Sequence, residues 1–217
     1  MSKKLNINLN TFFVSLLTLL ITLTTNLVNA NEEVSFSSEL SADKTYALID
    51  TSIGVIELEL YAKRTPKTVE NFIEYALDGF YTNTLFHRVI PNFMVQGGGF
   101  DQNFAQKATR SPVRNEANAF IPNIRGTISM ARTNDPDSAT SQFFINVVDN
   151  ASLNKTTTNP GYAVFGKVIK GLDIADKMSK VKTKREGYMA DIPVEPVIIH
   201  KVLIKRPIKP ASESIPQ

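Results

Sequence analysis

Residues 86–100, "FHRVIPNFMVQGGGF", combine groups able to do chemistry with residues typical of a buried strand. Arg88 is permanently charged and carries several N–H donors, and Gln96 carries an amide. A polar group buried among apolar residues lowers the stability of the fold unless it is hydrogen-bonded, and it is otherwise kept for a function. On one continuous strand, Phe86, Arg88 and Ile90 would share a face. The arginine would then stand among apolar side chains.

Two interpretations of Arg88 are open. It can form a structural ion pair, which is a common role for arginine. Its rigid guanidinium can instead face an apolar pocket and donate hydrogen bonds to a neutral substrate group. In the second case Phe93 and Met94 would line the pocket and Gln96 would add an amide. Otherwise Phe93 and Met94 are ordinary core residues.

Several other chemistries lack the residues that they need. Gly97-Gly98-Gly99 belongs to neither GxGxxG nor a GK[ST] loop, so it indicates a strand end or bulge with close backbone approach. No GxSxG is present to anchor a serine triad. The chain has no cysteine and only two distant histidines, His87 and His200, which make a poor metal set. We expect a structural role for His200 and neither a metal nor a cofactor.

The first thirty residues have the layout of a secretory signal peptide. Lys3 and Lys4 precede the apolar run 12–23, and Val28 and Ala30 suit a cleavage site. A membrane span needs about 20 apolar residues, more than this run provides. We expect cleavage after Ala30, no membrane association afterwards, and a periplasmic protein, with secretion as the alternative.

The rest of the 217 residues suggests a single domain. Lys and Arg exceed Asp and Glu by 24 to 21 in an even spread, which gives no reason to expect nucleic-acid binding. Alternating residues predict a hairpin at 46–61, and Thr65-Pro66 starts a helix that Gly79 ends. The apolar face of this helix is Val69, Phe72, Ile73, Ala76 and Leu77. Further strands are predicted at 84–90, 93–98, 126–132, 141–148, 162–169 and 194–205, and a second helix at 171–181. About eight strands with few helices indicate an all-β barrel or sandwich.

"FHRVIPNFMVQGGGF" resembles the signature of the cyclophilin family of peptidyl-prolyl cis–trans isomerases. "GTISMAR" (126–132), "SQFFINV" (141–147) and "YAVFGKVIKGLDIADKM" (162–178) follow in the family's order. The resemblance covers residues 45–205, leaving a polar lead-in at 31–44 and a disordered tail at 206–217. It implies an all-β fold, an eight-stranded antiparallel β-barrel capped by two α-helices.

The resemblance also implies the site. Arg88 matches the catalytic arginine. The proline pocket corresponds to Phe93, Met94, Phe144, Leu153 and Tyr162. Gln96 and Gln142 match polar contacts, Ala131 and Arg132 match the strand that pairs with substrate backbone, and His87 is a weaker candidate. Ser152 stands where many members have tryptophan or phenylalanine, so we expect weak or no binding of cyclosporin-type inhibitors.

The implied function is isomerisation of X–Pro peptide bonds, which assists the folding of exported proteins. The implied partners of the monomer are proline-containing peptides and unfolded exported proteins. Two alternatives use the same groove. It can belong to a non-catalytic chaperone or proline-peptide binding module, or packing can fill it in a purely structural protein.

Overall fold

The computed structural model describes residues 34–37 and 40–207. Contacts divide the chain into units 1–35 and 36–217, and the second unit contains the sheets and helices described below. The predicted signal peptide and residues 208–217 of the predicted tail lie outside the described residues. Within the described ranges, no helix is both long and apolar enough to cross a membrane.

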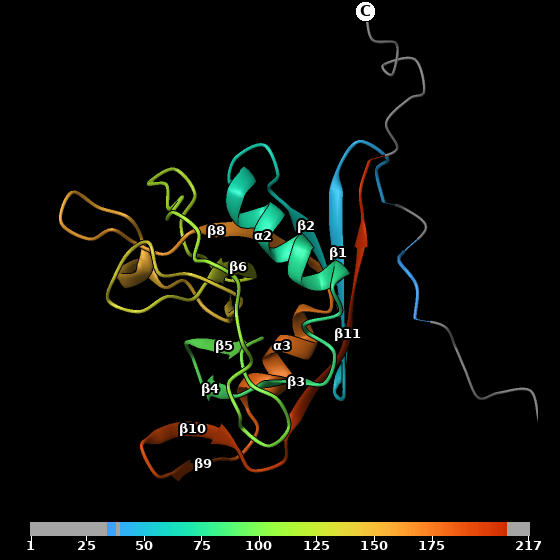
Figure 1. Cartoon of the computed structure of the whole chain (residues 1–217), viewed down its shortest axis with the longest axis vertical. Helices are drawn as coiled ribbons and strands as arrows, with labels where there is room; N and C mark the ends of the chain where they lie inside the picture. Colours follow the sequence, from blue (N-terminus) through green and yellow to red (C-terminus); the bar gives the residue numbers. More distant parts are fainter. Residues whose placement is uncertain (1–33, 38–39, 208–217) are drawn as a thin grey trace, which may run out of the picture. The chain divides into compact units, whose positions relative to one another are not determined.

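Nine strands form one antiparallel sheet that curls into a nearly closed barrel (Figure 1). Their order is β3-β11-β1-β2-β8-β6-β7-β5-β4. The bounds are β1 Thr45–Thr51, β2 Gly54–Leu60, β3 Thr84–Phe86, β4 Arg88–Ile90, β5 Met94–Gly97, β6 Thr127–Met130, β7 Phe143–Asn146, β8 Val164–Lys170 and β11 Val197–Lys205. The predicted all-β class is therefore confirmed.

The barrel's two end strands, β3 and β4, are consecutive in the chain and separated only by His87. The sequence predicts one strand over 84–90, and the break at His87 turns the expected eight strands into nine. Because of this break, the prediction that Phe86, Arg88 and Ile90 share one face is wrong. Phe86 is buried in the core, whereas Arg88 is exposed. The chain therefore turns Arg88 outward where the barrel closes.

The β1–β2 hairpin forms with the predicted alternation, since Ile56, Leu58 and Leu60 are all buried. The opposite face is more covered than a half-buried strand implies. Glu57 is only 2% exposed, accepts a hydrogen bond from the Ser37 hydroxyl at 2.7 Å, and pairs with Lys170 at 3.7 Å.

Helix α2, Pro66–Leu77, begins and ends close to the predicted positions. Thr65 occupies the N-cap position, but its side chain makes no capping bond. The Glu116 carboxylate instead accepts the backbone N–H groups of Lys67 and Thr68, at 3.2 and 2.7 Å. A carboxylate suits the positive end of a helix dipole. The predicted apolar face is buried except for Leu77, which is 66% exposed in the last turn.

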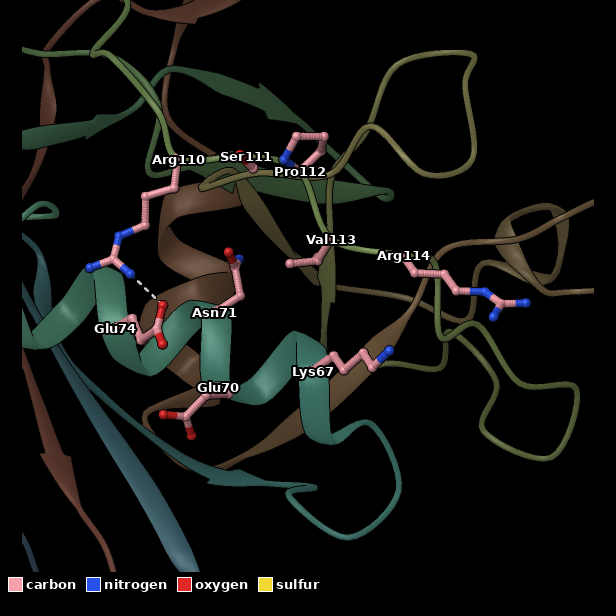
Figure 2. Close-up of a pocket in the computed structure, with 9 residues that line it drawn as sticks. All are labelled: Lys67, Glu70, Asn71, Glu74, Arg110, Ser111, Pro112, Val113 and Arg114. Carbon is pink, nitrogen blue, oxygen red and sulfur yellow. Dashed lines mark hydrogen bonds and ion pairs between the residues drawn. The ribbon is translucent and has the colours of Figure 1, made fainter.

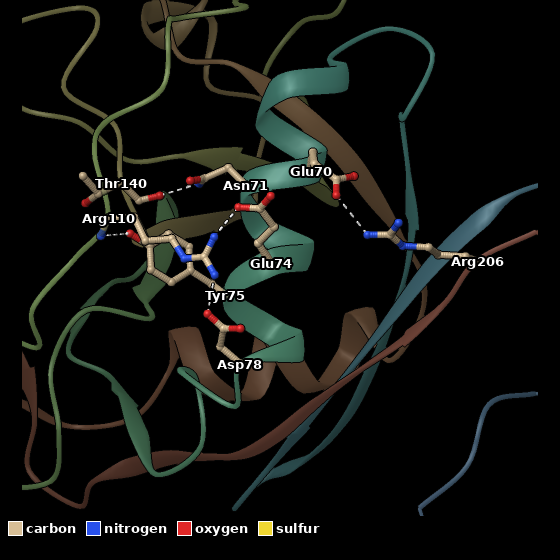
Figure 3. Close-up of polar contacts among 8 residues, drawn as sticks. All are labelled: Glu70, Asn71, Glu74, Tyr75, Asp78, Arg110, Thr140 and Arg206. Atoms are coloured by element: carbon tan, nitrogen blue, oxygen red, sulfur yellow. Dashed lines mark hydrogen bonds and ion pairs between the residues drawn. The ribbon is translucent and has the colours of Figure 1, made fainter.

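Polar contacts fasten α2 to the long connection between β5 and β6 (Figure 3). The Arg110 guanidinium pairs with Glu74 and Asp78, and its backbone N–H donates to the Tyr75 hydroxyl at 2.8 Å. Asn71 donates to the carbonyl of Thr140, in the connection between β6 and β7, at 2.6 Å. The second helix, α3 Leu172–Ser179, packs against β2, β4 and β5.

The three glycines lie where β5 ends, as the sequence predicts. A Cβ on Gly97 would lie 2.9 Å from the Leu85 carbonyl oxygen, so backbone passes close to backbone there. Gly98 has a φ of +82°, which a larger residue adopts only with strain. These glycines set the path of the chain.

One hairpin was not expected from the sequence. Strands β9, Thr183–Glu186, and β10, Met189–Pro193, pair only with each other, and β10 contacts β4 (Figure 1). All four residues of β9 are exposed, and because its sequence, TKRE, has no apolar residue, it lacks the apolar alternation that marks a strand.

Candidate active site

Nine side chains from distant parts of the sequence surround one cavity of about 200 Å³. We call this cavity the proline pocket, after the site that the sequence resemblance leads us to expect here. The residues that line it are Arg88, Phe93, Met94, Gln96, Ala131, Arg132, Phe144, Leu153 and Tyr162. All nine are candidate site residues from the sequence. The structure brings them together from the β4–β5 hairpin, the end of β6, strand β7 and the 151–163 connection.

The floor of the pocket is buried and apolar. Met94 on β5 and Phe144 on β7 are 2% and 4% exposed. The Tyr162 ring meets the Phe144 ring edge-on, with centroids 5.6 Å apart. Half-buried Phe93 and Leu153 contribute the rim. A small saturated ring would find apolar contacts below and around it.

The polar side of the pocket is a chain of side-chain amides that ends at Arg88. Arg88 Nη1 donates to Gln96 Oε1 at 3.5 Å, and Gln96 Nε2 donates to Gln142 Oε1 at 2.9 Å. Register pairing on neighbouring strands places these groups, since Arg88 lies opposite Gln96 and Gln96 opposite Phe144. Gln142 therefore supports the pocket from behind and does not line it.

Arg88 also has a partner in the β9–β10 hairpin. Its Nε lies 3.6 Å from Asp191 Oδ2, and both side chains are about 40% exposed, at 44% and 39%. Pairs this exposed contribute little to stability. The ion pair is thus compatible with a guanidinium that remains accessible to a substrate, and both interpretations of Arg88 from the sequence describe part of what is observed.

Arg132 and Ala131 follow the end of β6. The Arg132 guanidinium donates to the Gly161 carbonyl at 3.2 and 3.1 Å and lies over the Tyr162 ring, 4.3 Å from its centroid. It therefore holds the wall of the pocket. The amide of Ala131 donates to the Gln142 carbonyl at 2.9 Å, so this N–H is already engaged.

His87 lies outside the proline pocket. It is 4% exposed, its ring lies 4.6 Å from that of Phe100, and its Nδ1 has no hydrogen-bond partner among the described residues. Burial, with a smaller contribution from the neighbouring charge of Arg88, lowers its pKa from 6.5 to about 4, against the opposing effects of hydrogen bonds with Leu85 and Gln142. His87 is therefore neutral at pH 7.

A larger groove of about 690 Å³ lies elsewhere, between α2 and residues 110–114 (Figure 2). Charged side chains line it, and several already pair. Glu74 binds Arg110, and Glu70 binds Arg206 at 3.1 Å (Figure 3). It contains none of the candidate site residues from the sequence.

Two residues beside Arg88, namely Asp191 and Tyr188 of the hairpin, could not be predicted from the sequence. Gly187, at the hairpin turn, was the only available signal, and one glycine among charged residues is too common to indicate a site.

Comparison with known proteins agrees with this geometry. Residues 46–204 match the family described as "Cyclophilin type peptidyl-prolyl cis-trans isomerase/CLD". The chain therefore belongs to the cyclophilin family and is a cyclophilin-type peptidyl-prolyl cis–trans isomerase. Members of the family bind proline-containing peptides.

Two of the similar proteins are bacterial and one is a solved structure from Cryptosporidium parvum. The chain is 53% identical to peptidyl-prolyl cis-trans isomerase A of Dickeya dadantii over 171 residues, 78% of this chain and 90% of that protein. It is 50% identical to peptidyl-prolyl cis-trans isomerase B of Escherichia coli over 157 residues, 71% of this chain and 96% of that protein. A solved cyclophilin-type isomerase of Cryptosporidium parvum, crystallised in the presence of the dipeptide Ala-Pro, has a TM-score of 0.64 at 27% identity and covers 73% of this chain and 98% of its own.

Proposed function

We propose that the proline pocket is where this enzyme acts, with Arg88 as its catalytic residue. The observation that carries the proposal is the position of the accessible Arg88 guanidinium at the edge of a small cavity that has an apolar floor. The floor of Met94 and Phe144 would hold the proline ring. Arg88 would then lie beside the amide that rotates.

The chemistry needs no acid, base or nucleophile. An X–Pro bond resists rotation by about 18–20 kcal/mol because the amide is conjugated. At the half-rotated state conjugation is lost, and a lone pair returns to the prolyl nitrogen. An N–H of Arg88 directed at that nitrogen is bound more strongly as the twist develops, which is differential stabilisation of the transition state. A stabilisation of about 7 kcal/mol corresponds to about 10⁵-fold in rate.

The supporting side chains explain why Arg88 can be positioned without being buried. Gln96 holds one side of the guanidinium and Asp191 holds the other. A donor fixed before the reaction loses little freedom during it, so its full interaction contributes at the transition state.

The test is acceleration of cis-to-trans exchange in a short X–Pro peptide by the purified protein. Isomerase action predicts faster exchange at a fixed cis:trans ratio. Peptide binding without faster exchange would instead support a proline-peptide binding module.

We further propose that the protein acts on unfolded exported proteins, as a monomer in the periplasm. The support is the pattern of residues 1–30, with Lys3, Lys4 and a short apolar run before Ala30. Cell fractionation followed by N-terminal sequencing tests this. We expect a periplasmic chain that begins at Asn31. An intact Met1 in the cytoplasmic fraction would contradict it, and material in the culture medium would support secretion.

A further inference from the structure

A second cavity, of about 400 Å³, lies beside the proline pocket and shares Arg88 with it. We call it the hairpin cavity. Tyr188 of the β9–β10 hairpin lines one part, and Phe100 and Gln142 line another. Gln142 binds Gln96, which lines the proline pocket. The two cavities therefore meet along Arg88 and this pair of amides.

A tight turn and a bulge in the hairpin backbone determine where its side chains lie. A two-residue turn, Gly187-Tyr188, joins the strands, and Gly187 has the positive φ, +59°, that this turn needs at its first position. Tyr188 is 92% exposed. The register shifts between Met189 and Ile192, and Asp191 at this bulge has a φ of +62°. Bulges beside active sites redirect side chains, and this one directs Asp191 to Arg88.

The lining of the hairpin cavity suits an uncharged apolar group. Tyr188, Met189 and Phe100 offer aromatic and apolar surface. The two charges in the lining, Arg88 and Asp191, already pair with each other. An acidic ligand would compete for Arg88 and a basic one for Asp191, so neither charge is favoured. An exposed ring such as Tyr188 gains most from covering another large apolar side chain.

We propose that the hairpin cavity is a substrate subsite that binds a large apolar side chain near the proline of the same polypeptide. The proposal rests on the proposed function of the proline pocket. The occupant of the hairpin cavity is expected to be part of the same polypeptide that fills the proline pocket, because the two cavities adjoin. When a proline ring fills the proline pocket with its nitrogen at Arg88, the polypeptide must continue past Arg88 on one side, and the hairpin cavity is the adjoining space. The hairpin would thereby give the enzyme a sequence preference outside the X–Pro pair.

Exchange kinetics measured by NMR can test this with two kinds of peptide. One is a blocked Ala-Pro dipeptide, too short to reach the hairpin. The others are extended peptides with phenylalanine at one of the two positions before or after Ala-Pro. The variant is Tyr188→Ser, and the matched control is Phe120→Ser, because Phe120 is likewise 92% exposed but lines neither cavity.

The measured quantity is the ratio of kcat/KM for an extended peptide to that for the short one. We expect at least one phenylalanine position at which Tyr188→Ser lowers this ratio about fivefold, mainly through KM, while Phe120→Ser leaves it unchanged. Equal ratios for wild type and Tyr188→Ser at every position would overturn the subsite. Failure of the wild type to accelerate any peptide, the short one included, would instead overturn the proposed function on which the subsite depends.

Discussion

The buried His87 predicts a specific loss of stability in mild acid. Its pKa is about 4 in the folded protein and near 6.5 when the chain is unfolded. A depressed folded-state pKa in a histidine means that the unfolded chain takes up the proton first. The stability is therefore fully present above pH 6.5, falls as the pH drops from 6.5 to 4, and levels off below that for this group.

The size follows from the two pKa values. A difference of this size corresponds to about 3 kcal/mol in total, of which about 2 kcal/mol is lost between pH 7 and pH 5. Carboxylates with lowered pKa values, such as Asp176, contribute in the same direction but mostly at lower pH. The interval from pH 7 to pH 5 therefore isolates the histidine.

Urea unfolding at pH 7, 6 and 5 measures this effect. We expect the wild type and His200→Gln to lose about 2 kcal/mol over the interval, and His87→Gln to lose much less. His200 is the matched control because it is exposed in β11. NMR titration of the wild-type His87 ring provides a check that does not depend on a variant. An imidazole that titrates near pH 6.5, or an equal loss in all three proteins, would show that His87 does not cause the loss of stability in mild acid.

Two further predictions concern the surroundings of the pocket. Asp191→Asn should lower kcat/KM about two- to fivefold, because Arg88 loses a partner at its Nε. Glu195→Gln, which changes an exposed acid on the same segment, should have no effect. Equal activity of both variants would show that Asp191 does not orient Arg88. Ser152 is exposed beside the pocket residue Leu153. We therefore expect the wild type to bind cyclosporin weakly and Ser152→Trp to bind it about tenfold more tightly, as measured by calorimetry. Unchanged affinity would show that this position does not control inhibitor binding.

Most of the barrel could be predicted because its strands carry clear periodicity. The residues Ile56, Leu58 and Leu60 alternate with acids, and they are buried as expected. The break at His87 could not be predicted, because the run 84–90 contains no glycine, proline or other turn residue and closure of the barrel is a tertiary constraint. The helix cap shows the same limit. Thr65 has the right type and place, but Glu116, far along the chain, makes the bonds.

The candidate site followed from long family motifs, and the structure explains why their residues are spread along the chain. The pocket is assembled across neighbouring strands, so the residues that line it are as distant in sequence as Arg88 and Tyr162. The hairpin residues could not be found in this way. Asp191 faces Arg88 only because of a bulge and a left-handed backbone conformation, neither of which leaves a pattern in the sequence.

Substitution of Arg88 shows whether its guanidinium stabilises the half-rotated bond. Arg88 and Arg114 are both exposed, but only Arg88 lines the proline pocket, so Arg114→Ala is the control. In a prolyl-isomerisation assay, Arg88→Ala should lower kcat/KM at least about 100-fold, equivalent to about 2.7 kcal/mol, with unchanged urea unfolding. Arg114→Ala should match the wild type. Near-full activity of a folded Arg88→Ala protein would show that Arg88 does not stabilise the transition state.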